Sequence, residues 1–164
     1  MAVLGVCTVV LASSIWINPV AKGVPEITKS ETMQQIRDLV KEDPKAIWLV
    51  VDMAYPATNI PAMAGADCLN TTQTYPQKTR WEMLDQEGEY EDIYNRYCHI
   101  RASLGNKTML ELVSTDYVEV TLSPEDLKKL NIRYIVSTND FDEKIAAGTT
   151  NIFTESGIEF QKVL

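Results

Sequence analysis

The stretch Ala46-Ile47-Trp48-Leu49-Val50-Val51-Asp52 decides the fold class of this chain. It is an unbroken apolar run that begins just after Asp43-Pro44 and ends at Asp52. A short apolar run bounded by turn signals is typical of a central strand covered on both faces. The sequence therefore predicts a buried strand here, with Asp52 at its carboxyl end.

Helices are predicted before and after this strand. Met33, Ile36, Leu39 and Val40 repeat at helical spacing, and Thr28 with Glu31 is the pattern of a capping box at the start of that helix. Further helices are predicted over 77–84 and 87–97, with a short one near 60–64. Another begins at Ser123-Pro124, where a serine N-cap precedes a proline at the first helical position.

Strands are predicted over 66–69, 109–113, 117–122 and 132–136, and a closing hairpin is predicted from 151–153 and 158–160 across Ser156-Gly157. Strands that alternate with helices indicate an α/β fold. We expect a mixed sheet with flanking helices, preceded by the end of one N-terminal transmembrane helix.

The evidence for that N-terminal helix is the uncharged run from Met1 to Ala21, since Lys22 is the first charged residue. About 18 residues at roughly 1.5 Å each span about 27 Å, close to the hydrocarbon thickness of a bilayer, and Trp16 falls at the interface end. A secretory signal peptide or a buried helix are the alternatives. We expect a transmembrane segment over 1–21, the last span of a longer chain, and an extracytoplasmic domain over 22–164.

The charge balance narrows the choice of partners and cofactors. Fifteen basic and 23 acidic residues give a net charge of -8, which repels a phosphate backbone, so nucleic acid is not an expected partner. Neither a GxGxxG nor a P-loop pattern is present, and we expect no cofactor. Without a CxxC pair, and with His99 as the single histidine, no metal site is expected. Cys68 and Cys98 are either a disulfide or two buried thiols.

The candidate ligand-binding residues follow the apolar strand. In open α/β sheets, ligands bind beyond the carboxyl ends of the strands, which favours Asp52 and the loop from Asp52 to Tyr75. Asp52, Asn59, Asn70 and Tyr75 are suited to sugar hydroxyls, and Tyr75 or Trp81 can offer an apolar face. The alternative is that Asp52 is a turn residue bound to backbone amides. The catalytic residues stay unknown.

Two other patterns are interpreted as structural. The acidic stretch over 82–92 is more typical of a solvated helical face than of paired catalytic acids or calcium ligands. If the helix over 87–97 continued, Arg96 and His99 would share one face and could bind an anion and exchange a proton. No GxSxG motif is present, so a hydrolase triad has no support. A soluble enzyme would need Asp52 and His99 in one pocket.

A wider pattern of residues resembles one bacterial family. The pattern consists of Asn18-Pro19, Asn59-Ile60-Pro61, Leu69-Asn70, Tyr75-Pro76, Trp81 with Leu84-Asp85, the run from Tyr90 to Ile100, Leu122-Ser123-Pro124, Asp126-Leu127 and the run from Ile132 to Ser137. It resembles the extracytoplasmic C-terminal domain of large polytopic membrane proteins similar to GT-C glycosyltransferases. The resemblance implies a polyprenyl-phosphate sugar donor and an acidic catalytic residue in an early loop outside this chain.

We therefore expect an extracytoplasmic accessory domain of a membrane-embedded, glycosyltransferase-like protein, inactive alone and located at the cell membrane. Its expected partners are the lipid bilayer, through residues 1–21, and a polyprenyl-linked sugar or glycan acceptor met through the parent protein. The alternative is a membrane-anchored binding or interaction module without a transferase.

Overall fold

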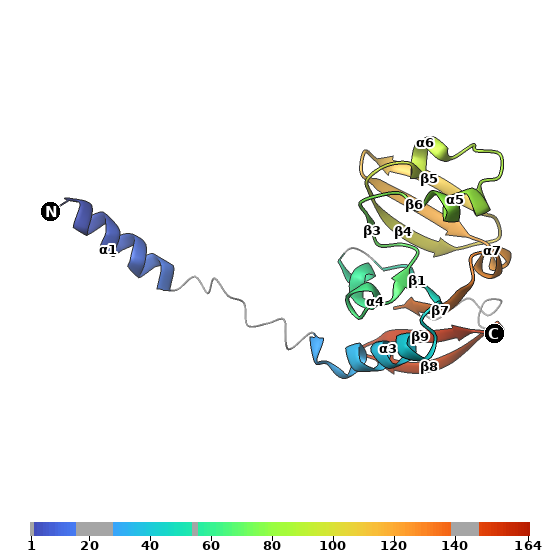
Figure 1. Cartoon of the computed structure of the whole chain (residues 1–164), viewed down its shortest axis with the longest axis horizontal. Coiled ribbons are helices and arrows are strands. Elements are labelled where there is room, and N and C mark those ends of the chain that lie inside the picture. Colours follow the sequence, from blue (N-terminus) through green and yellow to red (C-terminus); the bar gives the residue numbers. More distant parts are fainter. Residues whose placement is uncertain (1, 16–27, 54–55, 139–147) are drawn as a thin grey trace.

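The computed structural model describes residues 2–15, 28–53, 56–138 and 148–164 (Figure 1). Within them, nine strands form one mixed sheet. The strands are β1 (Ile47–Val51), β2 (Asp67–Cys68), β3 (Thr72–Gln73), β4 (Cys98–Leu104), β5 (Met109–Ser114), β6 (Tyr117–Leu122), β7 (Ile132–Ser137), β8 (Thr149–Glu155) and β9 (Ile158–Val163). The helices are α1 (Ala2–Ile15), α3 (Glu31–Glu42), η1 (Ala57–Asn59), α4 (Ile60–Met63), α5 (Lys78–Leu84), α6 (Glu91–Tyr94) and α7 (Pro124–Lys129).

The sheet has the order β5-β6-β4-β1-β7-β9-β8. Its centre is parallel, since β6, β4, β1 and β7 run in one direction, whereas β5, β9 and β8 pair antiparallel at the two edges. The short strands β2 and β3 pair with β1 and β4. The predicted α/β class, with a mixed sheet and flanking helices, is confirmed.

Two apolar clusters cover opposite faces of the sheet. Leu49 and Val51 of β1 belong to the cluster that α5, α6 and α7 close, through residues such as Trp81 and Leu127. Trp48 and Val50 point to the other face, where Met33 and Ile36 of α3 cover them. Because β1 is buried on both faces, its continuous apolar sequence is explained, and the predicted central strand is confirmed.

The face covered by α3 is divided into two halves. Its apolar half-face consists of Trp48, Val50, Tyr134, Val136 and Phe160, from β1, β7 and β9. Side chains alternate along each strand and Val51 pairs with Ala102, so the same face continues onto β4 and β6. There the polar half-face consists of His99, Arg101 and Ser103 on β4, paired respectively with Tyr117, Glu119 and Thr121 on β6. These side chains are half-buried, or exposed at Arg101.

Two local predictions were wrong at helix starts and ends. The N-cap of α3 is Ser30, whose hydroxyl accepts a hydrogen bond from Met33 N at 3.3 Å, rather than Thr28. The helix predicted over 87–97 is reduced to Glu91–Tyr94, because the Asp85 carboxylate accepts bonds from the backbone amides of Glu89 and Tyr90, both at 2.8 Å. These bonds hold the chain in a loop before α6.

The strand β4 was not predicted, and it replaces the continuation of that helix. Its sequence Cys98–Leu104 alternates buried and more accessible side chains, as a strand with one covered face does. Arg96 and His99 therefore share no helical face, since His99 lies on β4. The predicted strands over 109–113, 117–122 and 132–136 are confirmed, as is the hairpin of β8 and β9. Ser123 caps α7 with a complete capping box.

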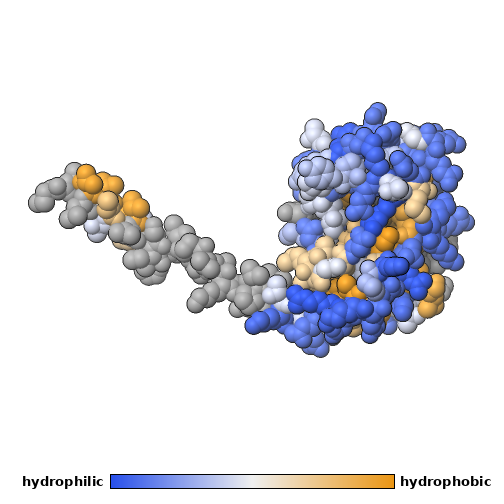
Figure 2. Space-filling view, viewed as in Figure 1, coloured by the Kyte–Doolittle hydropathy of each residue, from blue (hydrophilic) through white to orange (hydrophobic). Residues whose placement is uncertain are grey.

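The N-terminal helix α1 contains 14 residues. Val3, Val6, Val9 and Val10 are all exposed, and Figure 2 shows apolar side chains over this helix, whereas hydrophilic side chains dominate the visible surface of the domain. Among the described helices, none is long and apolar enough to cross a membrane. Residues 16–27, including Trp16, Asn18-Pro19 and Lys22, lie outside the described residues.

Candidate functional site

The loop after β2 is held against β1 by Asn70. Its side chain is completely buried; Oδ1 accepts a hydrogen bond from Val50 N at 2.9 Å, and Nδ2 donates one to Val50 O at 2.5 Å. The side-chain amide of Asn70 thus forms the hydrogen bonds that a neighbouring strand would otherwise form with Val50. It does not face a cavity. The structure places Asn70 as the residue that positions the loop.

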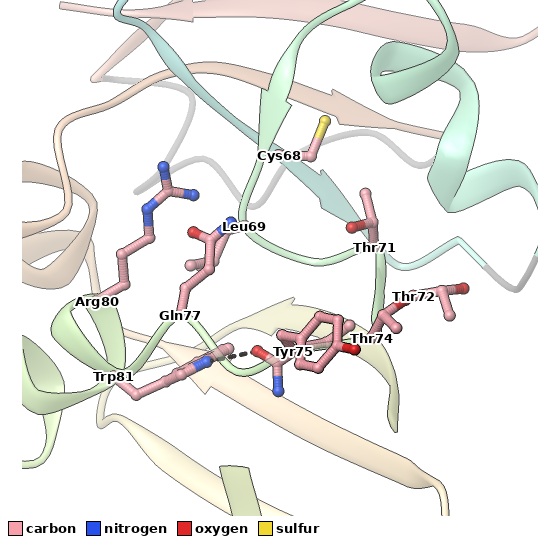
Figure 3. A pocket seen from close by; sticks show the side chains of 10 residues that line it. Cys68, Leu69, Thr71, Thr72, Thr74, Tyr75, Gln77, Arg80 and Trp81 are labelled. Carbon is pink, nitrogen blue, oxygen red and sulfur yellow. Dashed lines mark hydrogen bonds between the residues drawn. The ribbon is translucent and has the colours of Figure 1, made fainter. Parts of the chain in front are cut away.

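A cavity of about 210 Å³ opens beside this loop. We call it the threonine cavity; its lining includes Cys68, Leu69, Thr71, Thr72, Gln73, Thr74, Tyr75, Gln77, Arg80 and Trp81. Figure 3 shows Gln77 and Arg80 on one side and the threonines on the other. Tyr75 is 84% exposed. The predicted loop from Asp52 to Tyr75 therefore supplies much of the wall of this cavity.

Hydrogen bonds make one wall of the threonine cavity rigid. Trp81 Nε1 donates to Gln73 Oε1 at 2.8 Å, drawn in Figure 3, and Gln73 Nε2 donates to Tyr94 O at 2.9 Å. Trp81 is buried and stacks on Tyr94 with ring centroids 6.0 Å apart. Because its ring is enclosed in this way, Trp81 supports the wall instead of offering an open aromatic face. Among the described lining residues, Tyr75 is the one that offers an open aromatic face.

Hydroxyl and amide groups on both sides of the threonine cavity are available to a ligand. No described residue holds the side chains of Thr71, Thr74 or Gln77 in a hydrogen bond, whereas the Thr72 hydroxyl bonds His99 Nδ1 at 3.0 Å. In Figure 3 the Thr72 hydroxyl points away from the cavity. The available groups are therefore neutral donors and acceptors.

The charge of the threonine cavity is balanced. Arg80 is the charged residue of the lining, and its guanidinium forms a two-pronged pair with the Asp67 carboxylate, in which Nη1 donates to Oδ1 at 3.0 Å. A paired guanidinium has few donors left for a phosphate or carboxylate. The lining therefore suits an uncharged polar ligand.

The thiol at the edge of the cavity is unreactive. Burial, with a smaller effect of the nearby Asp67 carboxylate, raises the pKa of Cys68 to about 12. A thiol with this pKa is not a nucleophile near neutral pH. Burial also raises the pKa of Cys98, and both thiols are free, so Cys68 and Cys98 form no disulfide. Cys68 is therefore not a candidate nucleophile of this cavity.

Asp52 lines a second cavity, of about 180 Å³, at the carboxyl end of β1. Arg101, Ser103 and Glu119 of the polar half-face complete its lining, and we call it the Asp52 cavity. The Asp52 backbone has a positive φ of 56° and its amide donates to Ala102 O at 3.0 Å, which turns the chain away from the sheet. The exposed carboxylate is at the sheet edge that the topology favours for ligands.

The structure separates the other candidates. Asn59 ends the short helix η1, half-exposed and outside both cavities. His99 lines a small hollow with Thr72, Arg101 and Tyr117, whereas Asp52 lines its own cavity, so the two residues do not share one pocket. The described residues contain no group of three or more His, Cys, Asp or Glu side chains arranged to hold a metal ion.

Comparison with known protein families identifies the family to which the chain belongs. A family model described as "Domain of unknown function (DUF7654)" matches residues 26–160. The chain belongs to this family. The DUF7654 match begins before α3 and ends within β9, so it includes both cavities and the polar half-face. Neither a curated protein nor a solved structure matches the chain.

Two signals in the DUF7654 sequence could have identified more of this site. Cys98–Leu104 and Tyr117–Leu122 both alternate apolar and polar residues, which predicts two half-buried strands with polar side chains on one face. Arg101 and Glu119 would then have been candidates. The threonine cavity gave no such signal, because its lining combines short loop segments with α5.

Proposed function

We propose that the domain is an extracytoplasmic accessory domain of a membrane-embedded, glycosyltransferase-like protein, and that it binds sugar hydroxyls in the threonine cavity without catalysing transfer itself. The observation that carries the binding part is the neutral lining of this cavity. Thr71, Thr74 and Gln77 provide hydrogen-bond donors and acceptors, and Arg80, the charged side chain among the described lining residues, is paired with Asp67.

The absence of a reactive group in the threonine cavity supports a binding role. The Cys68 thiol is protonated at neutral pH, and the lining that the described residues form contains no carboxylate and no histidine. Catalysis of glycosyl transfer requires an acid or base near the reacting atoms. In the proposed arrangement, the catalytic residues belong to the parent protein and this domain orients the glycan acceptor.

The membrane part of the proposal has support in α1. Its described side chains are exposed and include several valines, an arrangement that costs free energy in water and is favourable in lipid. We propose that residues 1–21 attach the domain to the bilayer as the end of the last span of a polytopic chain. A polyprenyl-linked sugar donor would then reach the site from the membrane side.

Binding is tested by calorimetric titration of the whole chain, in a mild detergent, with neutral oligosaccharides. Thr71→Val and Thr74→Val remove one hydroxyl each and keep the side-chain shape, so each is expected to weaken binding about 3- to 10-fold, the equivalent of one hydrogen bond. Thr150→Val, at an exposed site on β8, is the matched control. Unchanged affinity in both cavity variants would remove this cavity from the proposal.

Attachment is tested by flotation with lipid vesicles. The whole chain is expected to float with vesicles and to need detergent in their absence, whereas residues 24–164 alone stay in solution as a monomer. If the whole chain remained in solution without detergent, the membrane part of the proposal would be wrong. A reading frame that extends upstream into many apolar spans would favour the transferase assignment over the alternative, a membrane-anchored interaction module.

A further inference from the structure

We infer that the binding site is elongated, and that a linear, uncharged glycan of at least three sugar units lies along β4 from the threonine cavity to the Asp52 cavity. The inference rests on the proposed function, because it takes sugar binding in the threonine cavity as its starting point. It adds the length of the ligand and a second set of contacting residues.

Three neighbouring hollows share their walls along this path. Thr71 and Thr72 line both the threonine cavity and the small hollow at His99, and Arg101 lines both that hollow and the Asp52 cavity. The middle hollow is only about 10 Å³, whereas the outer cavities are about 210 and 180 Å³. The path therefore has two deep ends joined by a shallow surface.

The path is longer than a single sugar ring. His99, Arg101 and Ser103 follow each other at every second position of β4, so the first and last are about 13 Å apart at roughly 3.3 Å per residue. The threonine cavity lies beside the His99 end of β4, because Thr72, which lines it, pairs with His99 across β3 and β4. A ligand that fills both cavities must be a chain of several units.

The side chains along the path suit an uncharged glycan. The three β4 residues of the polar half-face are each opposite a polar or aromatic partner on β6, and Ser103 Oγ and Thr121 Oγ1 are 3.2 Å apart. Arg101 Nη1 and Glu119 Oε1 are 3.5 Å apart, which balances their charges. Asp52 then leaves one excess negative charge at the far end. A phosphate or a uronic acid would be repelled there, and hydroxyl groups would be bound.

The polar half-face also differs from the two apolar clusters in what covers it. Both apolar clusters are closed by helices, and the polar half-face is continuous with the apolar half-face that α3 covers. Polar faces of sheets often contact only water. Here the Asp52 cavity on the polar half-face and the threonine cavity behind Thr71 and Thr72 provide the depth that a ligand needs and that a solvated face lacks.

The test measures how affinity depends on ligand length. The whole chain in a mild detergent is titrated calorimetrically with malto- and cello-oligosaccharides of one to six glucose units, which are linear and uncharged. Affinity for at least one of the two series is expected to increase about tenfold or more from one unit to four and then to stop increasing. Asp52→Asn and Glu119→Gln are expected to weaken binding of the tetramer about 3- to 10-fold and to leave binding of glucose unchanged.

Controls separate the two proposals. Glu125→Gln, an exposed acid on α7 that lines neither cavity, should bind every length as the wild-type chain does. If glucose and the hexamer bind equally and only Thr71→Val and Thr74→Val weaken them, the elongated site is overturned while the proposed function stands. If neither series binds, sugar binding in the threonine cavity is itself overturned, and the elongated site with it.

Discussion

The apolar and polar half-faces belong to one face of one sheet, and they differ in what covers them. Trp48 and Val50 on β1 are buried under α3, whereas Arg101, on the neighbouring strand β4, is exposed. Parallel pairing occurs in both halves, between β1 and β7 in the apolar half and between β4 and β6 in the polar half. The side chains therefore decide which half is core and which half lies nearer the surface among the described residues.

The two halves should respond differently to substitution. Side chains of the apolar half-face contribute free energy by removing apolar area from water, whereas paired charges at the surface contribute little. Substitutions in the apolar half-face are expected to change stability, and those in the polar half-face are expected to change binding.

The largest effect is expected for Trp48→Ala. The indole is 1% exposed and stacks on Tyr134 with ring centroids 4.4 Å apart. Its removal leaves a cavity between β1 and α3, and should lower the free energy of unfolding by about 3–5 kcal/mol. Chemical denaturation followed by circular dichroism measures this loss. Val50→Ala and Ile135→Ala, at fully buried sites of β1 and β7, should cost about 1–4 kcal/mol. A loss below 1 kcal/mol in all three would contradict the assignment of this core.

The next largest loss in the free energy of unfolding is expected for Asn70→Ala. The substitution removes both partners of the Val50 backbone, whose amide and carbonyl groups then stay buried without hydrogen bonds. Each such group costs about 1–3 kcal/mol, and the loss should be roughly 2–4 kcal/mol. Thermal unfolding measures it, with Asn59→Ala as the control at a half-exposed site. Equal unfolding temperatures for the two variants would show that Asn70 does not hold the loop.

A smaller, pH-dependent effect is expected from Cys68. Burial raises the pKa of its thiol from 9.0 to about 12, so above pH 9 the thiol ionises in the unfolded chain and stays protonated in the folded one. The unfolded state then binds fewer protons, and stability falls as the pH rises from about 9 towards 12. Between pH 8 and 10 the wild-type chain should lose about 1 kcal/mol more than Cys68→Ala. Identical pH profiles of the two chains would contradict the burial of this thiol.

The smallest effect on stability is expected in the polar half-face. Arg101 and Glu119 are both partly exposed, with side-chain exposures of 44% and 43%, so solvent screens their attraction. Arg101→Ala should change the free energy of unfolding by less than about 0.5 kcal/mol, as measured by urea denaturation. A loss as large as that of Val50→Ala would mean that the two half-faces do not differ as described.

Part of the candidate site was accessible from the sequence. The apolar run of β1 predicted where Asp52 lies, at the carboxyl end of a central strand, and the loop from Asp52 to Tyr75 was predicted to make the ligand contacts. Tyr75 lines the threonine cavity and Asp52 lines its own cavity. Asn59 and Asn70 were chosen with them for residue type alone, and residue type does not tell whether an amide faces a cavity or the backbone.

The sequence by itself determined the elements whose cause is local. The apolar runs of β1 and β7, the alternation in β5 and β6, and the Ser123-Pro124 start of α7 all follow from neighbouring residues. Patterns of this kind can be recognised in the sequence because the burial and capping that cause them act within one helix or strand.

Only the tertiary structure decided the parts that depend on distant segments. Asn70 bonds Val50 across 20 positions, Thr72 meets His99 across 27, and the polar half-face exists because β4 is placed between β1 and β6. A side chain's hydrogen-bond partner is fixed by which strands become neighbours, and strand order depends on the packing of the whole sheet. For this reason individual strands could be predicted from the sequence, whereas the position and lining of the two cavities could not.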